Sequence, residues 1–213
     1  MKTIILNGSP KGNSKNCNSL IFAEQFVKDM KNPCEIRCIA NSDKSELAKY
    51  IKDFDTVIMI MPLYIHAMPG IVMEFFEAME PAAEGKSIGF IIQAGFMETS
   101  QERFVVPYLE SFARKLNYSY LGTVCKGEAA AIYMMPNMFK KVLKMVSDLG
   151  AAYEENHAFD KELVKKLGKP YEITQPLLGI LRVVTRSGIN DVFWHREMKK
   201  HNAYEKRLDR PFL

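Results

Sequence analysis

Residues 4–11 read Ile-Ile-Leu-Asn-Gly-Ser-Pro-Lys and mark the end of a short apolar strand at a turn. A polar loop without an acidic residue continues to Asn18, and apolar residues then recur at helical spacing from Leu20 to Met30. A strand, a polar loop and a helix in this order present free backbone N–H groups and the positive end of a helix dipole to an anion. An ordinary strand-to-helix turn, with Asn18 or Ser19 as the helix N-cap, is the alternative interpretation.

The spacing of this loop excludes two common nucleotide sites. It matches neither GxxxxGK[ST], the pattern of ATP-binding P-loops, nor GxGxxG, the pattern of dinucleotide-binding Rossmann sites. The loop is instead rich in hydroxyl and amide side chains that donate hydrogen bonds to anions. These are Asn7, Ser9, Asn13, Ser14, Asn16, Asn18 and Ser19. The stretch therefore predicts a phosphate site for a ligand other than ATP or a Rossmann-bound NAD.

Length and composition indicate a soluble globular protein with one full α/β domain and an extension. The chain has 213 residues, of which 47% are hydrophobic and 25% charged, as in ordinary globular domains. No stretch approaches the roughly 20 uncharged apolar residues of a membrane span. Because Met1 and Lys2 lead directly into a strand, we expect no signal peptide, no membrane association and a cytoplasmic location.

Cysteine spacing and charge give no support to a metalloprotein or a nucleic-acid-binding protein. The four cysteines form no CxxC pair, so we expect neither a metal site nor an iron–sulfur cluster. The net charge is +4, and residues 159–213 hold 12 Lys and Arg against 7 Asp and Glu. A basic segment can attract anionic ligands, although a solvated helix face explains a mild excess equally well. No nucleic-acid-binding motif accompanies it.

Apolar runs and helical patterns alternate along the chain. Residues 57–61 and 88–92 are continuously apolar, which is typical of strands buried on both faces in a parallel sheet. Five β/α units in succession predict an α/β fold with a doubly wound five-stranded parallel sheet over residues 1–158, followed by a C-terminal helical extension over residues 159–213. We expect strands at 3–7, 34–40, 56–61, 87–93 and 119–125, and helices at 18–31, 45–53, 69–80, 100–116 and 137–156.

Ligands in doubly wound sheets bind beyond the carboxyl ends of the strands, where the strand order reverses. Three loops are expected there: the polar loop after the first strand, residues 62–70 after the third, and residues 93–98 after the fourth. The second contains Tyr64 and the third contains Phe96. One polar loop beside two aromatic-bearing loops suits a ligand with a phosphate at one end and a flat ring at the other.

These loops carry a resemblance to a known family. Asn7-Gly8-Ser9-Pro10-Lys11 with Asn18-Ser19, Pro62-Leu63-Tyr64 with Pro69-Gly70, and Gln93-Ala94-Gly95-Phe96 with Glu98 follow one another as in the flavodoxin-like NAD(P)H-dependent FMN reductases. The chain resembles this family, which includes relatives of the iron–sulfur flavoproteins, over roughly residues 1–150. It departs at Ser19, Ala94 and Met97, where the family usually has Thr, Ser and Pro, and it lacks the cluster cysteines.

The resemblance implies a flavodoxin-like sheet of order 2-1-3-4-5, an FMN cofactor and NADH or NADPH as electron donor. Ser9, Lys11, Asn16, Asn18 and Ser19 are then expected to hold the FMN phosphate. Pro62, Leu63, Tyr64 and Ile65 are expected to line the isoalloxazine, and Gln93, Gly95 and Phe96 to close its pyrimidine side. We expect an oxidoreductase that reduces a small acceptor such as a quinone, azo compound, nitro compound or free flavin. The alternative is a flavodoxin-type electron carrier that docks to protein partners.

Other residues have a less definite interpretation. His66 is a candidate proton donor, but a lone loop histidine is more often an exposed bystander, so we assign no catalytic side chain. Met134, Met135 and Met138 fit a soft wall of the site, core packing or a subunit contact. Helices expected at 177–184 and 192–198 carry apolar surface that needs cover, which leads us to expect a homodimer or homotetramer.

Overall fold

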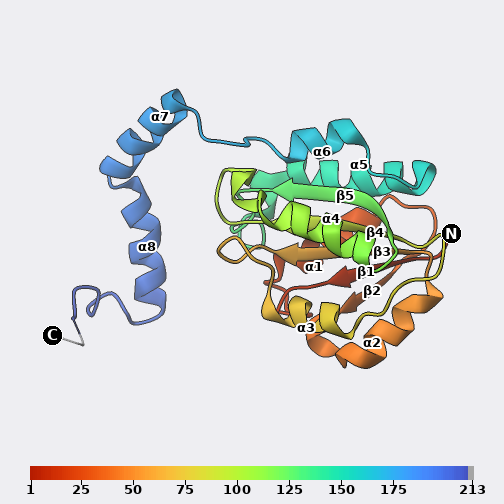
Figure 1. The fold of residues 1–213 in the computed structure, drawn as a ribbon. Coiled ribbons are helices and arrows are strands. Elements are labelled where there is room, and N and C mark those ends of the chain that lie inside the picture. Colours follow the sequence, from red (N-terminus) through yellow and green to blue (C-terminus); the bar gives the residue numbers. More distant parts are fainter. Residues whose placement is uncertain (211–213) are drawn as a thin grey trace. The chain divides into compact units, whose positions relative to one another are not determined.

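The computed structural model describes residues 1–210, leaving aside the side chains of residues 189, 190 and 193. The chain divides into two compact units, which are taken separately below (Figure 1). The larger unit is Met1–Glu172 and contains a twisted sheet covered by helices on both faces. The smaller unit begins at Ile173 and is helical.

All five strands of the larger unit are parallel and follow the order β2-β1-β3-β4-β5. This order confirms the predicted flavodoxin-like sheet. The strand bounds agree with the predicted ones to within one residue, except that β2 is shorter at both ends. The strands are β1 (Thr3–Asn7), β2 (Glu35–Cys38), β3 (Thr56–Pro62), β4 (Ser87–Gln93) and β5 (Ser119–Lys126).

Helices cover each face of the sheet over a separate hydrophobic core (Figure 1). On one face Phe22 and Phe26 of α1 pack with Leu149 of α5, and α6 continues this layer. On the other face Phe75 of α3 and Leu109 of α4 pack against the sheet beside α2. These helices are α1 (Asn18–Val27), α2 (Lys44–Tyr50), α3 (Gly70–Ala78), α4 (Val105–Lys115), α5 (Lys140–Asn156) and α6 (Lys161–Leu167).

Several predicted helices are shorter than expected because their ends adopt the tighter 3₁₀ form or a turn. The periodicity of apolar residues does not separate 3₁₀ from α-helical turns, since both place i and i+3 near each other. The predicted helix 18–31 ends at Val27, before the Asn32-Pro33 step that a helix cannot continue through. The 3₁₀ segments are η1 (Ile39–Asn41), η2 (Ile51–Asp53), η3 (Thr99–Glu102) and η4 (Pro136–Phe139).

Residues 159–172 belong to the sheet unit, so the division falls at 172/173, beyond the 158/159 position expected from the sequence. Phe159 is buried in the α1/α5 core, and its ring occupies the space beside Gly89 of β4, where a Cβ atom would lie 2.8 Å from it. Thr99 N donates to Pro170 O at 3.1 Å and Ser100 N donates to Tyr171 O at 2.9 Å. These bonds fasten the segment after α6 to η3.

The smaller unit consists of two helices, α7 (Gln175–Arg186) and α8 (Ile189–Lys200). Pro176 lies in the first turn of α7, where a proline needs no N–H partner. Gly188 separates the helices with φ +72°, a left-handed conformation that favours glycine. Ile180, Val183 and Val192 are exposed. No helix in residues 1–210 is both long and apolar enough to cross a membrane.

Candidate functional site

The N-terminus of α1 is open. Its N-cap is Cys17, which makes no side-chain cap, and the first turn contains no acidic residue. Ile21 N is the first helical amide to find a partner, Cys17 O at 3.1 Å, and within residues 1–210 the N–H groups of residues 18–20 have none. The alternative prediction of Asn18 or Ser19 as a capping side chain is therefore wrong. Unpaired N–H groups at the positive end of the helix dipole form an anion site.

The loop before α1 is held by its own backbone. Gly12 N, Ser14 N and Cys17 N each donate to a carbonyl three residues earlier, at 2.9–3.1 Å. Asn7 Nδ2 donates to Gly12 O at 2.9 Å, and Ser9 is buried with its hydroxyl accepting from Lys11 N at 3.2 Å. These bonds within the loop fix its shape.

The Lys11 side chain lies on the exposed rim of this loop. Its ammonium donates to Asn16 O at 3.2 Å and lies 5.2 Å from the centre of the Tyr133 ring. The side chain of Asn16 is exposed. Both predicted phosphate ligands are thus accessible, and Lys11 joins the first loop to the segment that follows β5.

Asn18 connects the same two segments more firmly. Its side-chain amide donates to Ala129 O at 2.7 Å and to Ala130 O at 3.3 Å, while its carbonyl oxygen accepts from Tyr133 N at 3.0 Å. Through these three bonds the Asn18 side chain holds the loop after β5 against the N-terminus of α1. This loop adjoins the open helix end, although the sequence pattern placed only three loops at the site.

Ser19 and Gln93 join the first and third predicted loops. Gln93 Nε2 donates to Ser19 Oγ at 2.7 Å, and both residues are buried. Gln93 O in turn accepts from Leu63 N at 2.8 Å, which brings the second predicted loop to the same place. The structure thus brings the three loops together at the carboxyl edge of β1, β3 and β4.

The loop after β3 has a strained tip. Pro62 and Leu63 are buried, and Tyr64 and Ala67 form a two-residue hairpin through N–H···O bonds of 2.8 and 3.1 Å. Between them Ile65 has φ +48° and His66 has φ +66°. Positive φ is unfavourable for a β-branched residue such as isoleucine, and such strain is common in segments that bind ligands.

His66 is held by the neighbouring segment. Its Nδ1 lies 3.0 Å from Gln101 O, and its ring packs edge-on against Phe104 with centroids 6.3 Å apart. These contacts anchor the strained hairpin to the segment around η3. They give His66 a structural role that requires no proton transfer.

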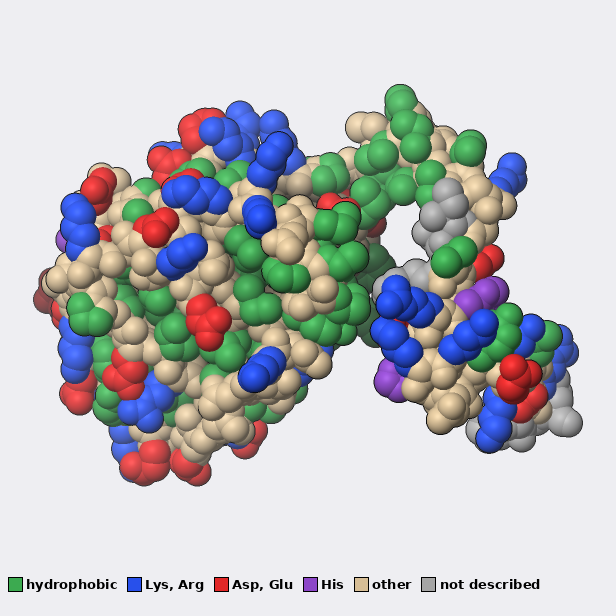
Figure 2. Space-filling view, turned by 180° about the vertical axis from the view of Figure 1, so that it is seen from behind, with side chains coloured by type: hydrophobic (Ala, Val, Ile, Leu, Met, Phe, Trp, Pro, Cys, Tyr) green, Lys and Arg blue, Asp and Glu red, His purple; other side chains and the backbone are tan. Residues whose placement is uncertain are grey.

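Exposed apolar side chains surround the meeting point of the three loops. Tyr64 is 48% exposed, Ile65 85% and Phe96 56%, and Gly95 beside Phe96 is also exposed. Figure 2 shows hydrophobic side chains gathered at this end of the larger unit, with acidic and basic side chains interspersed over the rest of that face. Partial burial raises the pKa of the Tyr64 hydroxyl, so it remains a neutral aromatic surface. A flat, largely apolar ligand fits such an edge.

Two charged residues near this edge were missed by the sequence analysis. Lys126, the last residue of β5, is only 6% exposed, and burial lowers the pKa of its ammonium. Glu102, at the end of η3, is fully buried, and neither carboxylate oxygen has a hydrogen-bond partner in the described residues. Burial raises the pKa of Glu102 to about 7, against smaller lowering effects of the Cys125 thiol and the Lys126 ammonium. The sequence offers no signal for either residue, because lysine and glutamate are ordinarily solvated.

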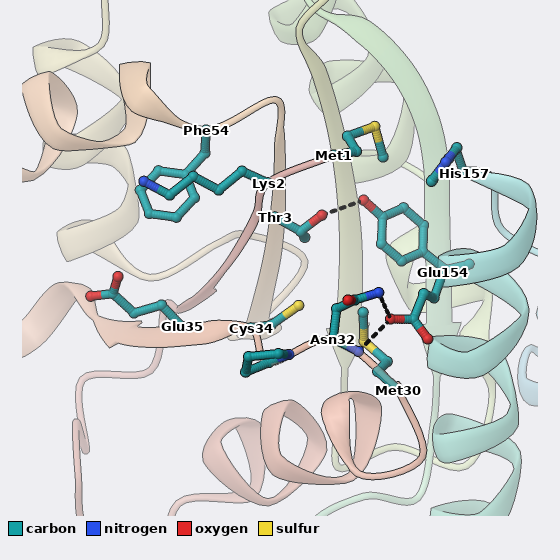
Figure 3. A pocket seen from close by; sticks show the side chains of 12 residues that line it. Met1, Lys2, Thr3, Met30, Asn32, Cys34, Glu35, Phe54, Glu154 and His157 are labelled. Carbon is teal, nitrogen blue, oxygen red and sulfur yellow. Dashed lines mark hydrogen bonds between the residues drawn. The ribbon is translucent and has the colours of Figure 1, made fainter.

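A pocket of about 560 Å³ lies at the opposite, amino-terminal end of the sheet (Figure 3). Several of its polar groups have hydrogen-bond partners within the larger unit: Thr3 Oγ1 and Tyr153 OH are 2.9 Å apart, and the Glu154 carboxylate accepts from Lys31 N and Asn32 N at 2.7 Å. These bonds tie α5 to β1 and to the segment between α1 and β2. The pocket is therefore explained by the packing of the amino edge.

The four cysteines are free thiols. Burial raises the pKa of the Cys34, Cys38 and Cys125 thiols, which keeps them protonated and poorly reactive. Among residues 1–210, no three His, Cys, Asp or Glu side chains come close enough together to hold a metal ion.

No protein-family model and no curated protein sequence matches the chain. Solved structures do match its fold. An NADH:FMN oxidoreductase in apo form has a TM-score of 0.54 and 13% identity over 79% of this chain and 96% of that one. An NADPH-quinone reductase from P. pentosaceus has a TM-score of 0.53 and 16% identity over 71% and 98%. An FMN-dependent NADH-azoreductase from Bacillus anthracis, in complex with FMN, has a TM-score of 0.50 and 16% identity over 70% and 99%. At these identities the similarity establishes the flavodoxin-like fold.

Proposed function

We propose that the protein is an FMN-dependent oxidoreductase that takes hydride from NADH or NADPH and reduces a small acceptor such as a quinone, azo compound, nitro compound or free flavin. The observation that carries this proposal is the open N-terminus of α1, adjoined by loops that expose Tyr64 and Phe96 at one sheet edge. A phosphate site beside a flat apolar surface matches a flavin mononucleotide. FMN is favoured over FAD because the loop ends in a site for a terminal phosphate.

The residues present fit the FMN phosphate. The unpaired N–H groups of residues 18–20 supply donors, and Lys11 on the rim supplies a cation. Each bond from such a donor to a phosphate contributes about 1.5–3 kcal/mol. Asn18 and Ser19 act through their backbone amides, while their side chains hold the neighbouring loops in place.

The strained hairpin and the loop after β4 fit the flavin ring. Tyr64 and Ile65 offer apolar surface, and the bond from Leu63 N to Gln93 O holds their loop beside the one after β4. The backbone of residues 94–96 is fixed in turn by bonds from Ala94 N to Lys126 O and from Glu128 N to Phe96 O. When bound, FMN supplies the chemistry, accepting hydride from a nicotinamide and passing electrons to the acceptor. This chain's residues orient the ring and exclude water from one side of it, and no side chain is assigned a proton-transfer role.

Three further observations support the enzyme over the electron carrier. Solved structures of similar fold include an NADH:FMN oxidoreductase, an NADPH-quinone reductase and an FMN-dependent NADH-azoreductase. The chain has a net charge of +4, whereas carrier flavodoxins are typically acidic for docking to basic partners. It also has a second helical unit with exposed apolar residues.

We also propose that the protein works as a homodimer or homotetramer in the cytoplasm, the compartment in which it meets its nicotinamide nucleotide. The exposed apolar residues of α7 and α8 support assembly because isolated helices with such surfaces tend to associate.

The absorption spectrum of the purified protein with added FMN tests the proposal. We expect the visible bands of a protein-bound oxidised flavin, and bleaching of these bands when NADH or NADPH is added without oxygen. Protein that binds no FMN, with unchanged thermal midpoint, contradicts both the enzyme and the carrier. Bound flavin that neither nucleotide bleaches, but that a reduced protein partner does, favours the carrier.

A further inference from the structure

Lys126 is a largely buried residue whose ammonium has no hydrogen-bond or ion-pair partner among the described residues. Its main chain is engaged, since its carbonyl accepts from Ala94 N at 2.9 Å. Its ammonium makes no hydrogen bond, ion pair or ring contact with any residue in the described part of the chain, although the residue is only 6% exposed. A buried charge of this kind is costly unless something compensates it. At such a position an apolar residue would be more stable than a lysine, unless the lysine binds an anion.

The position of Lys126 directs its side chain to the face of the sheet that α1 covers. Lys126 pairs directly with Gln93 in the parallel register, so the two side chains lie on the same face. Gln93 reaches Ser19 of α1, and Val124, two residues before Lys126, lies in the core between the sheet and α1. Lys126 therefore lies at the corner formed by the carboxyl ends of β4 and β5, and β4 contacts the first turn of α1 there through Gln93.

The ammonium itself opens to the surface. Among the side chains that the structure describes, the two Glu102 oxygens are the only nitrogen or oxygen atoms that are both sealed from the surface and without a hydrogen-bond partner. The Lys126 nitrogen also lacks a partner, so the small exposed part of the residue includes it. Glu128 and Glu102 attract the charge without forming an ion pair with it. The cation is thus available to a ligand at the edge.

The surrounding segments point to an anion at this corner. The N–H groups of residues 18–20 are free, and Asn18 holds the loop that follows Lys126 against the end of α1. Helix N–H groups and a nearby ammonium are complementary to the same phosphate dianion. The charge of Lys11, by contrast, is exposed and shared with Asn16 O.

We propose that Lys126 is the principal cation for the phosphate group of the flavin nucleotide, reaching it from the end of β5; this inference rests on the FMN-binding function proposed above. It assigns a ligand residue to a strand that lies outside the three loops of the sequence pattern. A phosphate at this edge then supplies the close ionic partner that Glu128 and Glu102 do not provide.

Fluorescence titrations of flavin with the apoprotein test this assignment. The variants are Lys126→Met, which keeps the length of the side chain without its charge, and Lys126→Arg, which keeps a cation. Lys115→Met is the matched control, since Lys115 is exposed in the last turn of α4, toward the amino-terminal edge. Each is titrated with FMN and with riboflavin, which has the same ring and no phosphate. We expect Lys126→Met to weaken FMN by about tenfold or more and to leave riboflavin unchanged.

Thermal unfolding of the apoproteins gives an independent readout. Because the partnerless charge is removed, Lys126→Met is expected to unfold at the same temperature as the parent protein or higher. A lower midpoint indicates that the ammonium is a structural contact and counts against the proposal. If Lys126→Met binds FMN within twofold of the parent affinity, the proposal is wrong. If the variant loses affinity equally for FMN and riboflavin, Lys126 contacts the flavin ring and not the phosphate.

Inorganic phosphate separates this inference from the proposed function. If the parent protein binds neither flavin, the FMN proposal fails. Stabilisation of the parent but not of Lys126→Met by phosphate, compared with sodium chloride at equal ionic strength, then still supports an anion site at Lys126. Equal stabilisation of both proteins rejects the anion site as well.

Discussion

Replacing Glu102 with glutamine is expected to stabilise the protein at alkaline pH. Glu102 is fully buried, its carboxylate oxygens have no hydrogen-bond partner among the described residues, and burial raises its pKa from 4.5 to about 7. The folded protein therefore holds a proton on Glu102 at pH values at which the unfolded chain has lost it. Stability falls with rising pH wherever the folded state binds more protons.

The magnitude follows from the pKa difference between the two states. Below pH 4.5 the carboxyl is protonated in both states and costs nothing, whereas above pH 7 it is ionised in both and the full cost is present. At about 1.4 kcal/mol per pKa unit, the loss between these limits is roughly 3 kcal/mol. For a domain of this size that corresponds to about 6–12 °C in the thermal midpoint. Glutamine has a similar shape and does not titrate.

Thermal unfolding at pH 5 and pH 8, without added flavin, measures this effect. The difference between Glu102→Gln and the parent protein is expected to be small at pH 5 and to reach several degrees in favour of the variant at pH 8. Carboxylates whose pKa is lowered by hydrogen bonds, such as Asp55 and Glu154, change stability in the opposite direction. Their contribution is the same in both proteins and cancels.

The exposed Glu84 provides the matched control, because Glu84→Gln makes the same chemical change on the surface. Its midpoint is expected to follow the parent protein at both pH values. An unchanged difference between Glu102→Gln and the parent from pH 5 to pH 8 refutes the reasoning, because Glu102 then has the same pKa in the folded and unfolded states.

Three further predictions concern the loops and the second unit. Asn18→Ala is expected to lower the stability of the flavin-free protein by about 1–3 kcal/mol, since it removes the bonds to Ala129 O and Ala130 O and leaves Tyr133 N without a partner; Asn16→Ala, at an exposed side chain, should not, and equal denaturation midpoints for the two variants would contradict this role of Asn18. Tyr64→Ala is expected to weaken FMN binding or turnover far more than His66→Ala, because Tyr64 exposes its ring while His66 is anchored to Gln101 O; similar titration curves and rates for both would place the ring elsewhere. Light scattering is expected to find a homodimer or homotetramer for the full chain and a smaller species after deletion of residues 173–213; a fully active monomer of the full chain would reject the assembly.

The sheet could be predicted because its central strands appear in the sequence as continuous apolar runs. Residues 57–61 and 88–92 are buried on both faces, so each is a continuous apolar run that no amphipathic helix imitates. Helix α6 was missed because seven residues with three lysines give too short a pattern. Its place in the larger unit depends on Phe159 and Leu167, whose burial follows from contacts with distant segments.

The site was predictable to the level of loops and not to the level of side chains. The carboxyl-edge rule and the resemblance located residues 7–19, 62–65 and 93–96, and the structure brings these segments together. The role of the Asn18 side chain could not be predicted from the sequence, because its hydrogen-bond partners lie more than 110 residues away in the chain. Lys126 and Glu102 stand out only once burial is known, since a lysine and a glutamate in sequence are ordinarily solvated.

The polar residues at this edge separate into those already satisfied by the protein and those left open. Asn18, Ser19 and Gln93 use their side chains on one another or on backbone groups, so they fix the loops whether or not a ligand is present. The N–H groups of residues 18–20 and the Lys126 ammonium have no such partners, and they lie at the carboxyl edge of the sheet, where Tyr64 and Phe96 are exposed. Folding normally pairs buried polar groups. Unpaired donors gathered beside a pre-ordered frame therefore indicate where a ligand contributes bonds that the chain does not make for itself. Substitutions in the frame should lower the stability of the flavin-free protein, whereas substitutions at the open donors should lower flavin affinity alone.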